Sequence, residues 1–300
     1  MAHDRRAGLG TEAAGFGWGI VGILAFSMTV PATRLAAPEL GGVVVGLGRA
    51  LVAAVLAGVF LLAVRARVPA RRHWPGLAIV ALGVVVGFPL CTSLALTRVP
   101  ASHAAVVVGL LPAATAVMAV LRAGERPPPA FWGACAAGVV AVLGFVVVEG
   151  AGRPQPADAL LLAAILLCGL GYAEGGRLAR DLGGGRVICW ALLLAAPAIA
   201  VPVALAARGG VQAGADAWLG FAYVSVISMF LAFFAWYHGL ALGGVARIGQ
   251  VQLAQPVLTL AWAALILGER VTLAMVVAAL AVLACVLATQ RARSAAAHRR

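Results

Sequence analysis

The chain contains no lysine, and charged residues of any kind are scarce. They make up 11% of its 300 residues, whereas a typical soluble domain has about 25%. Hydrophobic residues account for 63%, which excludes an ordinary soluble domain. The formal net charge of +12 comes from 22 arginines, which lie between apolar runs rather than along one face. A nucleic-acid-binding surface is therefore not expected.

Other motifs are missing as well. No G-x-x-x-x-G-K-[ST] loop occurs, so the chain is not expected to hydrolyse nucleotides as a pump. Nothing alternates between apolar and polar with a period of two, so a transmembrane barrel is not expected. The cysteines lie inside apolar runs without metal-ligand spacing, and we expect neither a metal nor a cofactor. They are Cys91, Cys135, Cys168, Cys189 and Cys285.

Long apolar runs are what the sequence does contain. Each has about 20 residues and can cross a hydrocarbon core of about 30 Å. Backbone groups find no water in that core, so the runs are predicted to be helices. Residues 1–14 are polar and the first run is full-length, so a cleavable signal peptide is not expected. The ten predicted spans are 15–36, 43–64, 75–96, 102–121, 130–149, 157–178, 186–207, 217–240, 246–267 and 271–289.

The arginines indicate how these spans are oriented. If both termini are cytoplasmic, sixteen of the 22 arginines fall on the inner side. Cytoplasmic loops of membrane proteins carry such an excess of positive charge. The sequence therefore predicts a multi-pass protein of the cell inner membrane, with a cytoplasmic segment 1–14 and a basic cytoplasmic tail 290–300.

The chain also repeats itself. Pro112 precedes Glu125 by thirteen positions, and Pro256 precedes Glu269 by the same distance, 144 residues further on. The repeats are residues 15–149 and 157–289, with five predicted spans each. Because five is odd, homologous halves must insert in opposite orientations. The fold class predicted is an all-α membrane protein with ten transmembrane helices in two inverted-topology five-helix repeats.

The ends of the proline-containing helices carry a motif. The second copy reads Leu267-Gly268-Glu269-Arg270-Val271-Thr272, and the first, Ala123-Gly124-Glu125-Arg126-Pro127, departs from it at the Leu and the Thr. An L-G-E-R-x-T motif and a proline in helices 4 and 9 resemble the ten-helix EamA-type branch of the drug/metabolite transporter superfamily. That resemblance implies a central cavity lined by helices 1, 3, 4, 6, 8 and 9, with helices 5 and 10 at the periphery.

Both prolines are candidates for kinks that open the helices around a solute. Helix interruptions at corresponding positions of two halves point to the binding site. The alternative is that proline is simply common in membrane helices. Glu125 and Glu269 are expected to be structural, each near the start of the following helix, where the helix dipole favours a carboxylate.

Polar residues inside the spans provide further candidates. Gln252 and Gln255 lie on one helix face, where they could bind a solute or join helices. Glu174 is the only acid well inside a predicted span, which makes it a functional candidate. Alternatively, it pairs with Arg177 or Arg34.

Three further ionisable residues have two interpretations each. Arg49 could counter Glu174 or a solute carboxylate, but we expect it to extend to the outer interface. His103 and His238 join Glu174 as candidates for proton coupling, although either could be a satisfied interfacial residue. The predicted cavity lining is Trp18, Phe88, Gly109, Leu111, Tyr172, Glu174, Trp236, Tyr237, Gln252 and Gln255.

The function predicted is a secondary transporter that exports small organic metabolites, with aromatic or apolar amino acids as the substrate class. Efflux of lipophilic cations and exchange of sugar phosphates or nucleotide-type metabolites are the alternatives. An intramembrane enzyme would need paired acids, or a histidine with an acid, at catalytic spacing inside the bilayer. It is not expected, because the spans contain one deep acid and two scattered histidines. The expected partners are the small-molecule substrate and the lipid bilayer. The sequence leaves the oligomeric state open, and a monomer is compatible with it.

Overall fold

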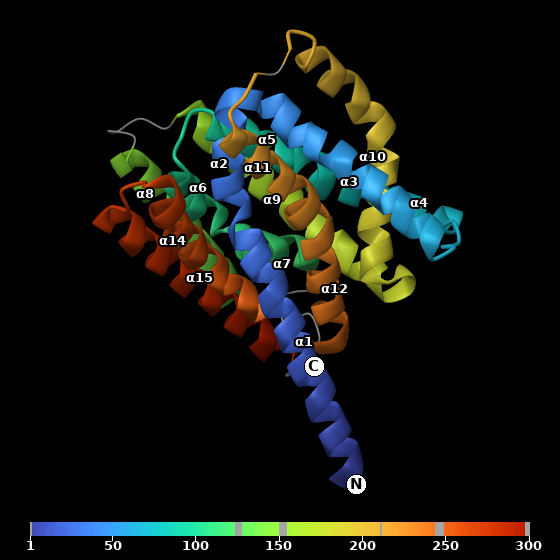
Figure 1. Cartoon of the computed structure of the whole chain (residues 1–300). Helices are drawn as coiled ribbons and strands as arrows, with labels where there is room; N and C mark the ends of the chain where they lie inside the picture. The colour runs from blue at the N-terminus through green and yellow to red at the C-terminus, as the bar shows by residue number, and fades with distance from the viewer. Residues whose placement is uncertain (1, 124–127, 150–154, 211, 244–248, 298–300) are drawn as a thin grey trace.

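The computed structural model describes residues 2–123, 128–149, 155–210, 212–243 and 249–297, and each element within these ranges is helical (Figure 1). The first half contains α1 (Ala2–Ser27), α2 (Thr29–Leu40), α3 (Gly42–Ala63), η1 (Arg71–His73), α4 (Trp74–Val80), η2 (Ala81–Gly87), α5 (Phe88–Leu96), α6 (Ala101–Val108), α7 (Leu111–Ala123) and α8 (Pro129–Glu149). The second half contains α9 (Pro156–Leu182), α10 (Gly184–Ala206), α11 (Ala215–Ala222), η3 (Tyr223–Leu231), α12 (Ala232–Gly243), η4 (Gly249–Ala254), α14 (Gln255–Leu267) and α15 (Leu273–Ala297).

Eight helical stretches in the described ranges are long and apolar enough to cross a membrane. They are Ala14–Leu40, Gly42–Ala63, Arg71–Leu96, Ala101–Arg122, Pro129–Val148, Pro156–Leu182, Gly184–Ala206 and Ala215–Gly239. Two shorter apolar helices, Val251–Leu267 and Leu273–Thr289, occupy the places of the predicted ninth and tenth spans. The start of the predicted ninth span lies at residues 244–248, outside the described ranges.

Helices from the two halves pack in matching pairs. The first span (α1, α2) lies along α12 and α11, and the sixth (α9) lies along α4, η2 and α5 in the same way. Three other contacts join equivalent helices directly: α3 with α10, α6 with α14, and α8 with α15. In Figure 1, α8 and α15 lie on one side of the bundle and α3 and α10 on the other. The halves are therefore interlocked along the whole bundle.

Glycines allow the closest of these contacts. A Cβ added at Gly83 would collide with the Leu167 carbonyl oxygen, and one added at Gly171 would lie 2.7 Å from Val84 Cγ2. Where α1 meets α12, a Cβ at Gly22 would lie 3.1 Å from the Trp236 backbone. Small residues bring helix backbones close together in membranes, where hydrophobic burial provides little driving force.

Two glycines turn the chain at equivalent corners. Gly41 has φ 84° and ψ 141°, and Gly183, 142 residues later, has φ 81° and ψ 137°. Each is the single residue between the end of one helix and the start of the next. Only glycine adopts this region of backbone conformation without strain. Both halves thus connect their first and second spans by the same turn.

Candidate functional site

Irregular helical segments surround the centre of the bundle. The first span is interrupted at Met28, between α1 and α2, and the fourth at Gly109 and Leu110, between α6 and α7. The third and eighth spans contain the π-helices η2 and η3, and the short 3-10 helix η4 precedes α14. π-helical segments are frequent at functional sites. Irregular backbone at membrane depth is tolerated where it lines a cavity or is buried in protein.

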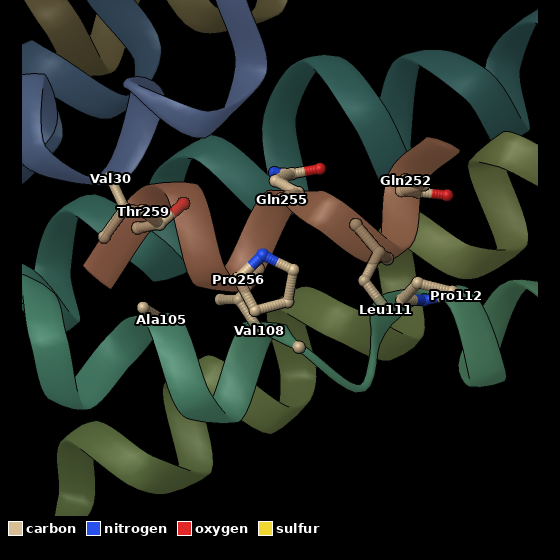
Figure 2. Close-up of a pocket in the computed structure, with 10 residues that line it drawn as sticks. Val30, Ala105, Val108, Leu111, Pro112, Gln252, Gln255, Pro256 and Thr259 are labelled. Carbon is tan, nitrogen blue, oxygen red and sulfur yellow. The ribbon is translucent and has the colours of Figure 1, made fainter. Parts of the chain in front are cut away.

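The two repeated prolines begin helices rather than bend them. Pro112 is the second residue of α7, and Pro256 is the second residue of α14. The first turn of a helix needs no backbone N–H donor, so proline is well accommodated there. The prediction of kinks within continuous helices was therefore wrong in form. The interruptions nevertheless fall at corresponding positions, and Pro256 lies beside Val108, the last residue of α6 (Figure 2).

Two adjoining cavities lie between these segments. The first has about 260 Å³ of empty volume and is lined by Val30, Ala105, Val108, Gly109, Leu111, Pro112, Gln252, Gln255, Pro256 and Thr259 (Figure 2). The second has about 430 Å³ and is lined by Phe26, Thr29, Val30, Arg49, Val84, Phe88, Leu111, Cys168, Tyr172, Ser228, Met229, Phe233 and Gln255. Because Val30, Leu111 and Gln255 line both, we treat them as one central cavity. No described side chain of α8 or α15 is part of the lining.

Hydrogen bonds hold the interruption in the first span. The Ser27 carbonyl oxygen accepts a bond of 2.8 Å from the Thr259 hydroxyl, and the Trp262 indole N–H donates to Ser27 Oγ over 2.9 Å. The Thr29 and Ser228 hydroxyls are hydrogen-bonded to each other at 2.8 Å. The second half of the chain therefore satisfies polar groups that the break in the first half leaves free.

Arg49 projects into the central cavity from α3. Its side chain is only 2% exposed, and its Nε and Nη1 atoms are buried without a hydrogen-bond partner. The prediction that it extends to the outer interface is wrong. Burying an unpaired charge costs several kcal/mol, so such a group is seldom left without a function.

Eight of the residues predicted from the sequence line the cavity. They lie at or next to the two proline breaks or on the aromatic faces of the third and sixth spans. They are Phe88, Gly109, Leu111, Pro112, Tyr172, Gln252, Gln255 and Pro256. Several lining residues were not predicted. Thr29, Cys168 and Ser228 have small side chains that the sequence pattern does not single out, and Arg49 and Phe233 were not expected to face the cavity.

Three predicted aromatic residues lie elsewhere. Trp236 and Tyr237 are buried between helices, and neither lines the cavity. Trp18 is 45% exposed on α1 and meets the ring of His238 edge-on, with 5.5 Å between ring centroids. Phe26 and Phe233, which pack edge-on at 4.9 Å, form the aromatic wall instead.

Glu174 also lies outside the cavity lining and is bound by two arginines. Its Oε2 atom accepts a bond of 2.6 Å from Arg122, and its Oε1 atom accepts one of 3.1 Å from Arg177 Nε. The Glu174 side chain is 1% exposed, whereas both arginines are about half exposed. Arg34 instead donates to the Leu96 carbonyl oxygen at 2.6 Å. The cluster of Glu174, Arg122 and Arg177 connects α7 to α9.

The two candidate histidines have different surroundings. His103 Nε2 lies 2.7 Å from Asp158 Oδ1, and both residues are buried. The other oxygen of Asp158 accepts a bond of 2.7 Å from the Gln155 backbone N–H at the start of α9. His238 is exposed on α12. A buried hydrogen bond therefore joins α6 to α9, while His238 has its ring contact with Trp18.

Glu269 has a structural contact, but not the predicted one. Its two carboxylate oxygens accept bonds of 2.8 Å each from the backbone N–H groups of Ala101 and Ser102, at the start of α6. The capped helix thus belongs to the other half of the chain, and it is not the helix that follows Glu269. Its counterpart Glu125 lies outside the described residues.

The fold defines a multi-pass membrane protein with a largely apolar cavity between its irregular helical segments. A model of the EamA-like transporter family matches the chain twice, over residues 13–147 and 155–290. The chain belongs to this family, which confirms the resemblance inferred from the repeated motif.

One relative and one solved structure illustrate the extent of the similarity. The chain is 48% identical over 279 residues to "Uncharacterized transporter YdeK" of Bacillus subtilis (strain 168), covering 92% of this chain and 97% of that protein. It also resembles a crystal structure with a TM-score of 0.62 and 21% identity, over 94% of this chain and 99% of the other. At that identity the likeness concerns the fold alone.

Proposed function

We propose that this chain is a secondary transporter with ten membrane spans that exports small organic metabolites by alternating access. The observation that carries the proposal is the central cavity, which is enclosed between the two halves and lined by irregular helical segments from both. Its lining combines many apolar side chains with a few polar groups, as small-molecule sites generally do. Rocking of one half against the other around it would expose the solute to each side in turn.

Opposite insertion of the two halves is supported by the interlocked packing and by the shared turns at Gly41 and Gly183. The proposed topology puts both termini on the cytoplasmic side of the inner membrane. The start of α1 and the end of α15 lie toward the same end of the bundle (Figure 1). Labelling of single cysteines placed at 124–126 and 268–270 in intact cells tests this topology. The proposal requires that the two sites react from opposite sides, and reaction from one side would contradict it.

Amino acids with apolar or aromatic side chains are the substrate class that we propose. The amide of Gln255 and the hydroxyls of Thr29 and Ser228 could bind the polar end, and the rings of Phe26 and Phe233 could contact the side chain. No acid lines the cavity among the described residues, which disfavours lipophilic cations. In the part of the chain that the structure describes, Arg49 is the one arginine of the lining, which disfavours doubly charged sugar phosphates.

Counterflow in proteoliposomes tests transport and its coupling together. Vesicles loaded with an unlabelled apolar or aromatic amino acid should accumulate its labelled form, whereas the organic cations and sugar phosphates of the same panel should not accumulate. Repeating the measurement with a pH gradient tests Glu174, His103 and His238 as carriers of a coupled proton. If Gln255→Ala leaves counterflow unchanged, the proposed solute site is wrong.

A further inference from the structure

The second cavity contains one buried cation. Arg49 lies within the span Gly42–Ala63 and is 2% exposed, and its Nε and Nη1 atoms have no hydrogen-bond partner. A guanidinium group is not deprotonated in proteins and carries five N–H donors. Buried charges are normally paired or hydrogen-bonded. Arg49 therefore provides unused donors inside the chamber where a solute would bind.

The protein's own acids do not fill this position in the described part of the chain. None of the four ion pairs found there includes Arg49. The two buried acids within the spans are already engaged, Glu174 by Arg122 and Arg177, and Asp158 by His103. No Asp or Glu is among the described residues that line either cavity.

The rest of the lining is neutral and largely apolar. Its hydrogen-bonding side chains beside Arg49 include Thr29, Ser228 and Gln255, while Phe26 and Phe233 contribute aromatic surface. A planar guanidinium matches a carboxylate in geometry as well as in charge, and can bind it through two parallel N–H···O bonds. Among the described lining residues, an ammonium group would meet neutral oxygens and ring faces, together with the like charge of Arg49.

We infer that Arg49 binds the carboxylate of the transported solute, and that this carboxylate is the required recognition element while an amino group is dispensable. The substrate class is then organic monocarboxylates with an apolar or aromatic body, of which amino acids are one kind. The inference rests on the proposed transport function and narrows it. It excludes amines that lack a carboxylate.

Three solutes of matched shape separate these alternatives: 3-phenylpropanoate, phenylalanine and phenethylamine. The first has only the carboxylate, the second has both charged groups, and the third has only the ammonium. In counterflow, wild-type protein should carry the first two and not the third. Phenethylamine should also fail to compete with 3-phenylpropanoate.

Variants connect the selectivity to the residue. Arg49→Met should reduce flux of both carboxylates at least about tenfold, since a charge-assisted pair is lost. Arg49→Lys should retain part of the flux, because it keeps the charge but loses the planar fork. Arg98→Met, which removes an exposed arginine outside the cavity, is the matched control and should transport normally.

Thermal unfolding in detergent distinguishes a binding role from a structural one. Without solute, Arg49→Met should melt at the wild-type temperature or above it, because a buried unpaired charge has been removed. With 3-phenylpropanoate, wild-type protein should be stabilised and Arg49→Met should not. If Arg49→Met does not fold, the solute series on wild-type protein and Arg49→Lys decides the matter.

The possible failures are distinct. Equal flux of phenethylamine, or unchanged carboxylate flux in folded Arg49→Met, would overturn the role of Arg49 and leave the transport function standing. If wild-type protein carries no member of the wider panel of amino acids, cations and sugar phosphates, the proposed function itself is wrong, and this inference fails with it.

Discussion

The Glu269 carboxylate caps the helix that begins at Ala101, although the two residues are 168 positions apart. One oxygen accepts from the Ala101 N–H and the other from the Ser102 N–H, each at 2.8 Å. The first N–H groups of a helix have no partner within it, and the positive end of its dipole favours an anion. The Gly-Glu-Arg turn of one repeat thus fixes the start of a cavity-lining span in the other.

Glu269→Gln should lower the free energy of unfolding by about 1–2 kcal/mol, because the amide can accept only one of these bonds and carries no charge. Denaturant titration of the purified protein in detergent would measure it. Glu39→Gln is the control, since Glu39 accepts one bond at an exposed position, from the Gly214 N–H. An equal effect of the two substitutions would contradict the capping role of Glu269.

The contact of η2 with α9 gives a second prediction. Gly83→Ala should destabilise the protein by about 1–3 kcal/mol, because the new methyl group has only backbone to displace at Leu167. Gly176→Ala, on α9 itself, adds a methyl group that meets nothing within 4 Å, and should be neutral or slightly stabilising. Melting temperatures of the two variants make the comparison, and similar values would argue against close packing at Gly83.

The sequence predicted the cavity best where prolines and polar residues interrupt the apolar spans. Repeated prolines and nearby polar residues mark Pro112, Pro256, Gln252 and Gln255, and all four line the cavity. The spacing of Tyr172 and Glu174 could have predicted that only one of them faces the cavity. Residues two apart on a helix point to different sides, and only Tyr172 lines the cavity.

Other positions could not be predicted because they depend on tertiary packing. The span that holds Arg49 is apolar on every side, so no face of it is marked as inward. In the eighth span, the π-helix η3 changes the number of residues per turn, which rotates the residues after it. Phe233 faces the cavity there, and the predicted Trp236 and Tyr237 do not.

The equivalent turns at Gly41 and Gly183 should respond alike to substitution. Each has a φ above +80°, so alanine would be strained by about 1–3 kcal/mol even though open space surrounds both positions. Gly209→Ala is the control, because that glycine also has open space but no positive φ. Unfolding titrations of the three variants test this. If one corner is sensitive and the other is not, the halves do not share the turn in solution.

Glu174→Gln should lower the stability of the protein without lowering its affinity for the solute. Loss of the charged hydrogen bonds to Arg122 and Arg177 should cost about 1–3 kcal/mol of unfolding free energy. A double-mutant cycle with Arg122→Gln measures the coupling free energy between Glu174 and Arg122. Since Arg122 is about half exposed, this coupling should be only about 0.5–1 kcal/mol. Solute affinity, measured by thermal stabilisation, should stay at the wild-type value. A clear loss of affinity would return Glu174 to the solute site.

The pair of His103 and Asp158 allows proton coupling to be tested separately from stability. His103→Gln and Asp158→Asn should each lower the free energy of unfolding by about 1–3 kcal/mol, and the double variant should lose less than the sum. If this pair carries the coupled proton, both variants should keep exchange at equal pH and lose any acceleration by a pH gradient.

His238→Gln is the control, because His238 is exposed and its ring contacts only that of Trp18 among the described aromatic side chains. It should leave stability and gradient response unchanged. Loss of the gradient response in His238→Gln, with His103→Gln unaffected, would transfer the role to the exposed histidine.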